Sequence, residues 1–144
     1  MMREKVKVLR VVDGDTLEVE VAGRKEHVRL LYIDCPELHS EDVFERKKAL
    51  EAKRYVIEQI KNSQEVILST RKRFRNRDRY GRLVVDIYLD GKLLQAMLVR
   101  QGLACLRYFG RDLSPGIMDR INFLLRLENQ ARARKKGVWK RSLA

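Results

Sequence analysis

Residues 6–36, VKVLRVVDGDTLEVEVAGRKEHVRLLYIDCP, decide the fold of this chain. Apolar residues recur in three runs, which are separated by the turn residues Asp-Gly-Asp and Ala-Gly. Side chains that alternate with a period of two lie on the same face of a strand. The stretch therefore predicts β-strands over residues 6–12, 16–21 and 27–33. The third strand ends before Pro36, because proline cannot donate to a central ladder.

The rest of the chain adds helices and two further strands. A run without Gly or Pro predicts a helix over residues 42–61, and alternation predicts strands over residues 65–70 and 83–89. Residues 94–102 predict a short helix closed by glycine, and Ser114-Pro115 predicts the start of a last helix. Five short strands with a helix after the third indicate an α+β fold that is mainly β barrel. We expect a five-stranded OB-fold barrel with about three helices packed outside it.

Charge is the most unusual property of the composition. The 144 residues include 32 lysines and arginines against 20 aspartates and glutamates, which gives a net charge of +12. A strongly basic domain indicates a polyanionic partner, and we expect DNA and/or RNA. No apolar run approaches the roughly 20 residues of a membrane span, so we expect no membrane partner. The length favours one domain over residues 1–144, and we expect a monomer.

The first residues show no apolar segment followed by a cleavage site, so no export leader is visible. We therefore expect a cytoplasmic protein as encoded. An exported protein whose leader has been removed is the alternative.

Three clusters carry groups suited to chemistry, and each one alone has an ordinary structural explanation. The segment Asp13-Gly14-Asp15-Thr16 has the residues of a turn, and Arg29 with the carboxylates of residues 34–37 resembles a salt-bridged strand end. Residues 71–82 contain seven arginines and lysines, which is typical of a solvated loop. Phe74 and Tyr80 are interleaved with these cations, and that pattern also suits stacking on single-stranded nucleic acid.

Together the three clusters meet the needs of phosphodiester hydrolysis. Carboxylates such as Asp15 and Asp34 are hard oxygen ligands for Ca²⁺ or Mg²⁺, and a metal polarises the phosphate. Paired guanidiniums grip phosphate oxygens, and a further carboxylate such as Glu37 is suited to orient or deprotonate water.

The ordered set of motifs resembles the staphylococcal nuclease (thermonuclease) family, and the resemblance covers residues 11–139. Any one of these motifs alone is weak evidence for the family, whereas the whole set in this order is specific to it. The motifs are VDGDT at 12–16, RLLYIDCPE at 29–37, DRYGR at 78–82, LVRQGLA at 98–104 and GVW at 137–139.

The resemblance implies a five-stranded OB barrel with three helices and a calcium-dependent endonuclease. Such an enzyme hydrolyses DNA and/or RNA at the P–O5′ bond and leaves 3′-phosphate ends. Other divalent ions are not excluded, and the preferred nucleic acid stays open. The alternative is a catalytically silent nucleic-acid-binding module of the OB type, because a basic barrel is sufficient for binding.

The resemblance also assigns a metal site. Asp15 and Asp34 match the family's carboxylate calcium ligands. Cys35 stands where the family often has threonine and would contribute its backbone carbonyl, which does not depend on the side chain. Asp13 matches an acidic residue near the metal, and we place it in the outer shell.

Catalytic and substrate-binding residues follow in the same way. Arg29 and Arg82 match two phosphate-binding arginines, and Glu37 matches the general base, which acts through a water. Three residues match positions that contact the nucleotide: Arg79, Tyr80 and Tyr108.

The resemblance bears on the two cysteines as well. In the family fold the segment after Asp34 lies near the segment that contains Cys105. A Cys35–Cys105 disulfide and a pair of free thiols both stay open.

Overall fold

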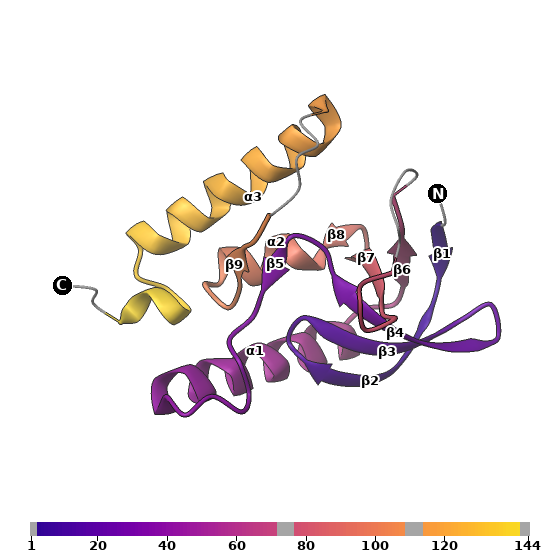
Figure 1. Ribbon diagram of the computed structural model, residues 1–144, viewed down its shortest axis with the longest axis horizontal. Helices are drawn as coiled ribbons and strands as arrows, with labels where there is room; N and C mark the ends of the chain where they lie inside the picture. The colour runs from indigo at the N-terminus through magenta and orange to yellow at the C-terminus, as the bar shows by residue number, and fades with distance from the viewer. Residues whose placement is uncertain (1–2, 72–76, 109–113, 142–144) are drawn as a thin grey trace.

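The computed structural model describes residues 3–71, 77–108 and 114–141, and within them it contains nine strands, three α-helices and one 3-10 helix (Figure 1). The strands are β1 (Arg3–Lys5), β2 (Lys7–Asp13), β3 (Thr16–Val21), β4 (Arg24–Leu30), β5 (Ile33–Asp34), β6 (Val66–Ser69), β7 (Leu83–Leu89), β8 (Lys92–Leu93) and β9 (Cys105–Leu106). The helices are α1 (Val43–Lys61), α2 (Leu94–Arg100), α3 (Pro115–Ala133) and the 3-10 helix η1 (Gly137–Lys140). None of the described helices is both long enough and apolar enough to cross a membrane.

One curved sheet forms the centre of the molecule, with strand order β1-β6-β7-β4-β3-β2 and β8 beside β7. All neighbours are antiparallel except β4 and β7, which run parallel with Val28 opposite Leu83. The two strands at the ends of this order, β1 and β2, are consecutive in the chain on either side of Val6. The predicted α+β fold with helices outside the sheet is confirmed. Strand pairing does not close the sheet into a barrel, because its end strands β1 and β2 are linked by the backbone at Val6 and not by a ladder of hydrogen bonds.

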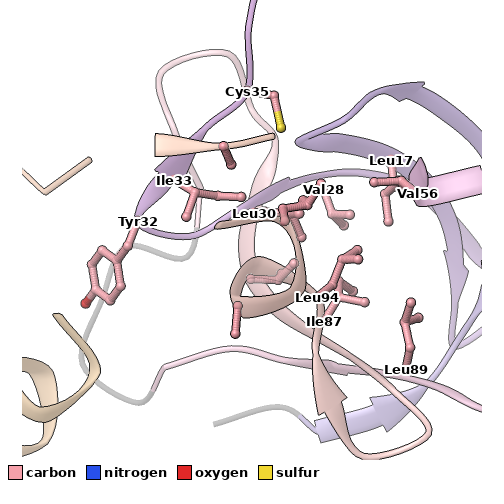
Figure 2. Packing of buried hydrophobic residues seen from close by; sticks show 14 of the residues in the cluster. Leu17, Val28, Leu30, Tyr32, Ile33, Cys35, Val56, Ile87, Leu89 and Leu94 are labelled. Carbon is pink, nitrogen blue, oxygen red and sulfur yellow. The ribbon is translucent and has the colours of Figure 1, made fainter. Parts of the chain in front are cut away.

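The core lies inside this curved sheet and under the helices. Leucine, valine and isoleucine side chains from several strands and from α2 meet there with almost no exposed surface (Figure 2). Helix α1 packs against β2, and α3 packs against α2 and β9. A polar site is built where β2, β4 and the separate two-stranded sheet of β5 and β9 end.

The strand expected over residues 27–33 is interrupted, and this interruption creates part of the site. Strand β4 ends at Leu30, and a turn follows in which Tyr32 adopts the left-handed conformation with φ of 67°. The short strand β5 then pairs with β9, with Asp34 opposite Cys105. Apolar alternation continues through the turn and therefore conceals it. The turn redirects the backbone, so Asp34 lies beside β9.

Two glycines hold the end of α2 against the segment that begins η1. Gly102 and Gly137 both have positive φ, and the Val138 N–H donates to the Gly102 carbonyl at 2.8 Å. A Cβ atom on Gly102 would lie 2.2 Å from the Lys136 carbonyl oxygen. This contact links the motifs at 98–104 and 137–139. The backbones of the two segments approach so closely that neither Gly102 nor Gly137 has room for a side chain.

We expect Gly102→Ala to destabilise the protein by more than the cost of left-handed alanine alone. Gly91→Ala is the matched control, because Gly91 has φ of 82° and open space around its Cβ position. The control should lose about 1–2 kcal/mol through strain. Gly102→Ala should lose several kcal/mol in urea unfolding, since backbone must also move. Equal losses in the two variants would contradict the proposed close contact.

Candidate active site

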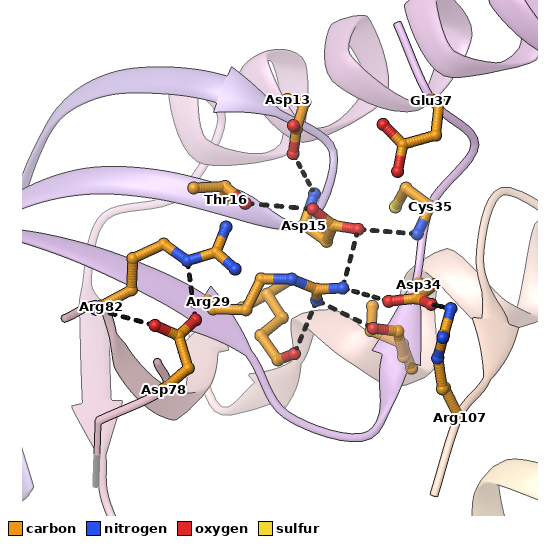
Figure 3. Close-up of polar contacts among 12 residues, drawn as sticks. Asp13, Asp15, Thr16, Arg29, Asp34, Cys35, Glu37, Asp78, Arg82 and Arg107 are labelled. Carbon is orange, nitrogen blue, oxygen red and sulfur yellow. Dashed lines mark hydrogen bonds and ion pairs between the residues drawn. The ribbon is translucent and has the colours of Figure 1, made fainter. Parts of the chain in front are cut away.

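The turn between β2 and β3 presents a buried carboxylate. Asp15 is 7% exposed, and its Oδ1 accepts a hydrogen bond from the Thr16 hydroxyl at 3.1 Å. Its Oδ2 accepts from the Cys35 backbone N–H at 2.8 Å, and its own N–H donates to Asp13 Oδ1 at 3.2 Å. These bonds fix the Asp15 side chain between the turn and the residue that follows β5 (Figure 3). Asp13 thus supports the backbone of Asp15, and its assignment to the outer shell of a metal stays a prediction.

The middle residue of this turn must be small. A Cβ atom on Gly14 would lie 2.8 Å from Cys35 Sγ and 2.9 Å from Ala52 Cβ. Glycine therefore lets the turn approach both the segment after β5 and helix α1. The close approach brings Asp15 within reach of the Cys35 backbone.

Burial also changes the acidity of Asp15. Loss of solvent raises its pKa to about 6, and a side-chain interaction with the Asp13 carboxyl group adds to the rise. The positive charge of Arg29 acts in the opposite direction and compensates in part. The Asp15 carboxylate consequently depends on nearby positive charge to stay ionised.

Arg29, near the end of β4, supplies that charge. Its Nη2 lies 3.3 Å from Asp15 Oδ2 and also pairs with Asp34 Oδ1. Its Nη1 donates to the carbonyls of Leu30 at 3.0 Å and Ile33 at 2.8 Å, on either side of the turn. The structure therefore brings Asp15, Arg29 and Asp34 together, and two carboxylates converge on one guanidinium nitrogen (Figure 3).

This convergence fits a hard cation. Among the described residues no three His, Cys, Asp or Glu side chains form a ligand set. Two carboxylate oxygens nevertheless point at a single positively charged atom, and oxygen donors of this kind suit Ca²⁺. The protein would supply few side-chain ligands, so backbone, water or substrate oxygens would complete the shell. The contribution of the Cys35 carbonyl stays a prediction.

A second arginine lies on the other side of this cluster. The Arg82 Nε donates to Asp78 Oδ2 at 2.7 Å, and Asp78 Oδ1 accepts from the backbone N–H groups of Tyr80 and Arg82. Burial opposes ionisation of Asp78, but these hydrogen bonds lower its pKa below the usual value. Asp78 therefore holds Arg82 by one edge. Arg29, Asp34 and Arg82 line a common hollow of about 230 Å³.

Two tyrosines lie near this cluster, Tyr80 beside Arg82 and Tyr108 just after β9. Tyr80 is 68% exposed, and the guanidinium carbons of Arg79 and Arg82 lie 4.9 and 5.2 Å from the centroid of its ring. Tyr108 meets the Tyr32 ring edge to face, with 5.4 Å between the ring centroids. Tyr80 thus offers a solvent-facing surface for stacking, whereas Tyr108 is supported by a buried ring.

Glu37 stands in solvent just after β5. Its backbone N–H donates to Glu45 Oε1 at 3.3 Å, and its own carboxylate has no partner among residues 3–71, 77–108 and 114–141. It lines a second hollow of about 500 Å³ together with Asp34 and residues of α1, β9 and η1. In Figure 3 its carboxylate lies on the same side of β5 as Asp15.

Two arginines behave differently from the sequence-based picture. Arg77, part of the basic loop, forms a bidentate pair with Glu26 at 3.0 and 2.9 Å and so is engaged within the protein. Arg107, which sequence reasoning did not select, pairs with Asp34 Oδ2. Its only sequence signal is its position beside Tyr108. The remaining loop residues Lys72, Arg73, Phe74 and Arg75 lie outside the described residues.

The cysteines are both free thiols, so the disulfide alternative is wrong for this structure. Cys105 lies opposite Asp34 in the β5–β9 pair, whereas Cys35 is the next residue along and is buried beneath Gly14. Cys105 is therefore paired across the two strands with Asp34 and not with Cys35, which lies one residue beyond the end of β5.

Comparisons with known proteins give matches over most of the chain. A family model described as staphylococcal nuclease homologue matches residues 27–141. Endonuclease YncB of Bacillus subtilis (strain 168) is 34% identical over 142 residues, covering 92% of this chain and 60% of that protein. The SPbeta prophage-derived endonuclease YokF of the same organism is 32% identical, with 92% and 43% covered. Thermonuclease of Staphylococcus hyicus is 29% identical, with 92% and 74% covered. The chain thus spans 60% or less of the two Bacillus relatives.

We expect Gly14→Ala to destabilise the protein by about 1–3 kcal/mol, because an added methyl group would overpack against Cys35 and Ala52. Gly116→Ala is the control, since Gly116 lies in α3 with open space at its Cβ position. The control should be neutral or stabilising by up to about 1 kcal/mol, because alanine favours helix. The free energy of unfolding of both variants is measured in urea. A Gly14→Ala variant as stable as the parent would show that the turn can shift to accommodate a methyl group.

Proposed function

This chain belongs to the staphylococcal nuclease family, and from that premise we propose that it is a calcium-dependent endonuclease. It would hydrolyse phosphodiester bonds of DNA and/or RNA at P–O5′ and leave 3′-phosphate ends. The observation that carries the proposal is the convergence of Asp15 and Asp34 on the Arg29 guanidinium, beside the hollow that Arg82 lines. Relatives named endonuclease and thermonuclease support the same reaction class.

Asp15 and Asp34 would hold the metal, with the Cys35 backbone carbonyl as the third protein ligand in our proposal. The bound metal would supply positive charge that polarises the phosphate and offsets the charge developing on it. Asp13 would act from the outer shell, because it fixes the backbone that carries Asp15. This arrangement leaves the substrate side of the site to arginines.

Arg29 and Arg82 would bind the phosphate from the protein side. Arg29 is restrained by two backbone carbonyls, so its guanidinium is already oriented before substrate arrives. Arg82 uses Nε for Asp78, and no described residue forms a hydrogen bond with its two terminal nitrogens. Donors that are held in place before the reaction stabilise the developing charge without the cost of reorganisation.

Glu37 would orient or deprotonate the attacking water. Its carboxylate is exposed and unpaired among the described residues, so it is able to accept a proton. It lines the larger hollow, which shares Asp34 with the hollow of the two arginines. General base and phosphate-binding groups would therefore flank Asp34 from two sides.

Tyr80, Arg79 and Tyr108 would contact the nucleotide. An exposed tyrosine close to two guanidiniums offers both stacking and charge, which together bind a single strand without selecting its sequence. These contacts do not select a base, so the proposal covers both DNA and RNA.

The first test is cleavage of single-stranded and duplex DNA by the purified protein, with Ca²⁺ or with excess chelator. We expect Ca²⁺-dependent fragments that end in 3′-phosphate, identified by their resistance to extension until a phosphatase is added. DNA that stays intact but shifts on a native gel would contradict the proposal and favour the silent binding module. Cleavage that persists in chelator would remove the metal from the mechanism.

The second test replaces one arginine of the site. We expect Arg82→Ala to lower kcat by roughly 10²–10³-fold, as measured for the loss of a single donor to a transition-state charge. Arg77→Ala is the matched control, because Arg77 lies on the same loop but is paired with Glu26. The control should keep kcat within a few fold. Steady-state rates on single-stranded DNA decide, and an equal loss in both variants would indicate damage to the loop instead.

A further inference from the structure

Asp34 is held by two arginines, one on each carboxylate oxygen. Arg29 pairs with Oδ1 and Arg107 pairs with Oδ2 (Figure 3). We propose that Arg107 is an additional phosphate-binding residue, which Asp34 restrains until a cation takes that carboxylate and releases the guanidinium to the substrate. The inference rests on the proposed nuclease function and adds to it a residue that couples cation and substrate binding.

The backbone of Arg107 is fixed next to Asp34. It follows β9, which pairs with β5 so that Cys105 stands opposite Asp34, and its N–H donates to the Tyr32 carbonyl at 2.6 Å. The Cα atom of Arg107 is therefore held in place by the backbone. Any movement that transfers the guanidinium between partners is a rotation of the side chain alone.

The two arginines differ in how far water reaches them. The Arg29 side chain is 19% exposed and also bonds two backbone carbonyls, whereas the Arg107 side chain is 56% exposed. Exposed ion pairs contribute little net free energy, since water competes for both partners. Arg29 is therefore suited to stay in place, and Arg107 is suited to exchange Asp34 for another anion.

Arg107 also lies where a bound strand would pass. The hollow of about 500 Å³ that contains Glu37 and the hollow of about 230 Å³ that contains Arg82 have two residues in common, Asp34 and Arg107. A strand that occupied both hollows would cross this pair. One phosphate of that strand would lie on the side of Asp34 away from Arg82. The Arg107 guanidinium could reach this phosphate by rotation of its side chain.

Competition for Asp34 has a thermodynamic consequence. A cation that binds Asp34 must displace Arg107, and the released guanidinium then favours a phosphate. Because coupling between two ligands is reciprocal, the phosphate in turn strengthens cation binding. Arg107 would thus weaken the site for Ca²⁺ alone and strengthen it for Ca²⁺ together with nucleic acid.

The first experiment is calorimetric titration of the folded protein with Ca²⁺ in the absence of nucleic acid. We expect Arg107→Ala to bind Ca²⁺ roughly three- to tenfold more tightly, because one competitor for Asp34 is gone. Arg107→Lys should stay near the parent, since it keeps the charge. Arg141→Ala is the matched control, because Arg141 lines the larger hollow but pairs with Asp42, and its affinity should change by less than about twofold. Unchanged or weaker binding in Arg107→Ala would overturn the competition.

The second experiment measures KM for single-stranded DNA at saturating Ca²⁺. Arg107→Ala should raise KM about tenfold with kcat within a few fold, because a charge-assisted contact with the bound strand is lost. Arg107→Lys should recover part of the affinity. An unchanged KM in Arg107→Ala would overturn the phosphate contact.

The two proposals fail separately. If the parent protein does not cleave DNA, the nuclease proposal fails, and calorimetry still decides whether Arg107 competes for Asp34. If the parent cleaves but Arg107→Ala changes neither Ca²⁺ affinity nor KM, the inference about Arg107 alone fails.

Discussion

The Arg29 guanidinium holds together two segments of the chain whose carboxylates, Asp15 and Asp34, would otherwise repel each other. It contacts Asp15 from the β2–β3 turn, Asp34 from β5, and the carbonyls on both sides of the turn at residues 31–32. Two carboxylates brought this close destabilise each other, and burial of Asp15 makes the problem worse. The cation offsets both effects. Removing it would leave the buried Asp15 carboxylate without its positively charged neighbour, which is costly in a protein interior.

Positions far from the site determine how this cluster is enclosed. The contact between Gly102 and Gly137 brings η1 back towards the loop before α1, where Arg141 pairs with Asp42 and lies over the Phe44 ring. Val138 in η1 and Arg141 after it therefore line the same hollow as Glu37. This segment is part of the wall around the site, although no motif there carries chemistry.

Local sequence patterns predict much of this structure. Alternation predicts β2, β3 and β7, and the absence of Gly and Pro predicts α1 to within a residue at its start. The motifs also identify Asp15, Arg29, Asp34 and Arg82, which the fold brings to one place. These predictions share a basis, since each depends on residues that are close in sequence or on an ordered family pattern.

The features that sequence reasoning missed depend on contacts between distant segments. The turn at Tyr32 interrupts an apolar alternation that continues through it, so the pattern has no break to detect. Arg107 is one exposed cation in a chain with 32 lysines and arginines, and only the β5–β9 pairing gives it a special neighbour. Arg77 is neutralised by Glu26, which lies 51 positions earlier.

The division of the first strand at Val6 bears on the order in which the chain can fold. Strands β2, β3 and β4 are neighbours in sequence and can pair as soon as residues 7–30 are available. Strand β1 must wait for β6, because Arg3 pairs with Ser69. Pairing across such a distance is slow, since a long loop has to close first. Until then β1 and the early hairpins present unpaired edges, which are the places where a chain under synthesis is most exposed to joining another.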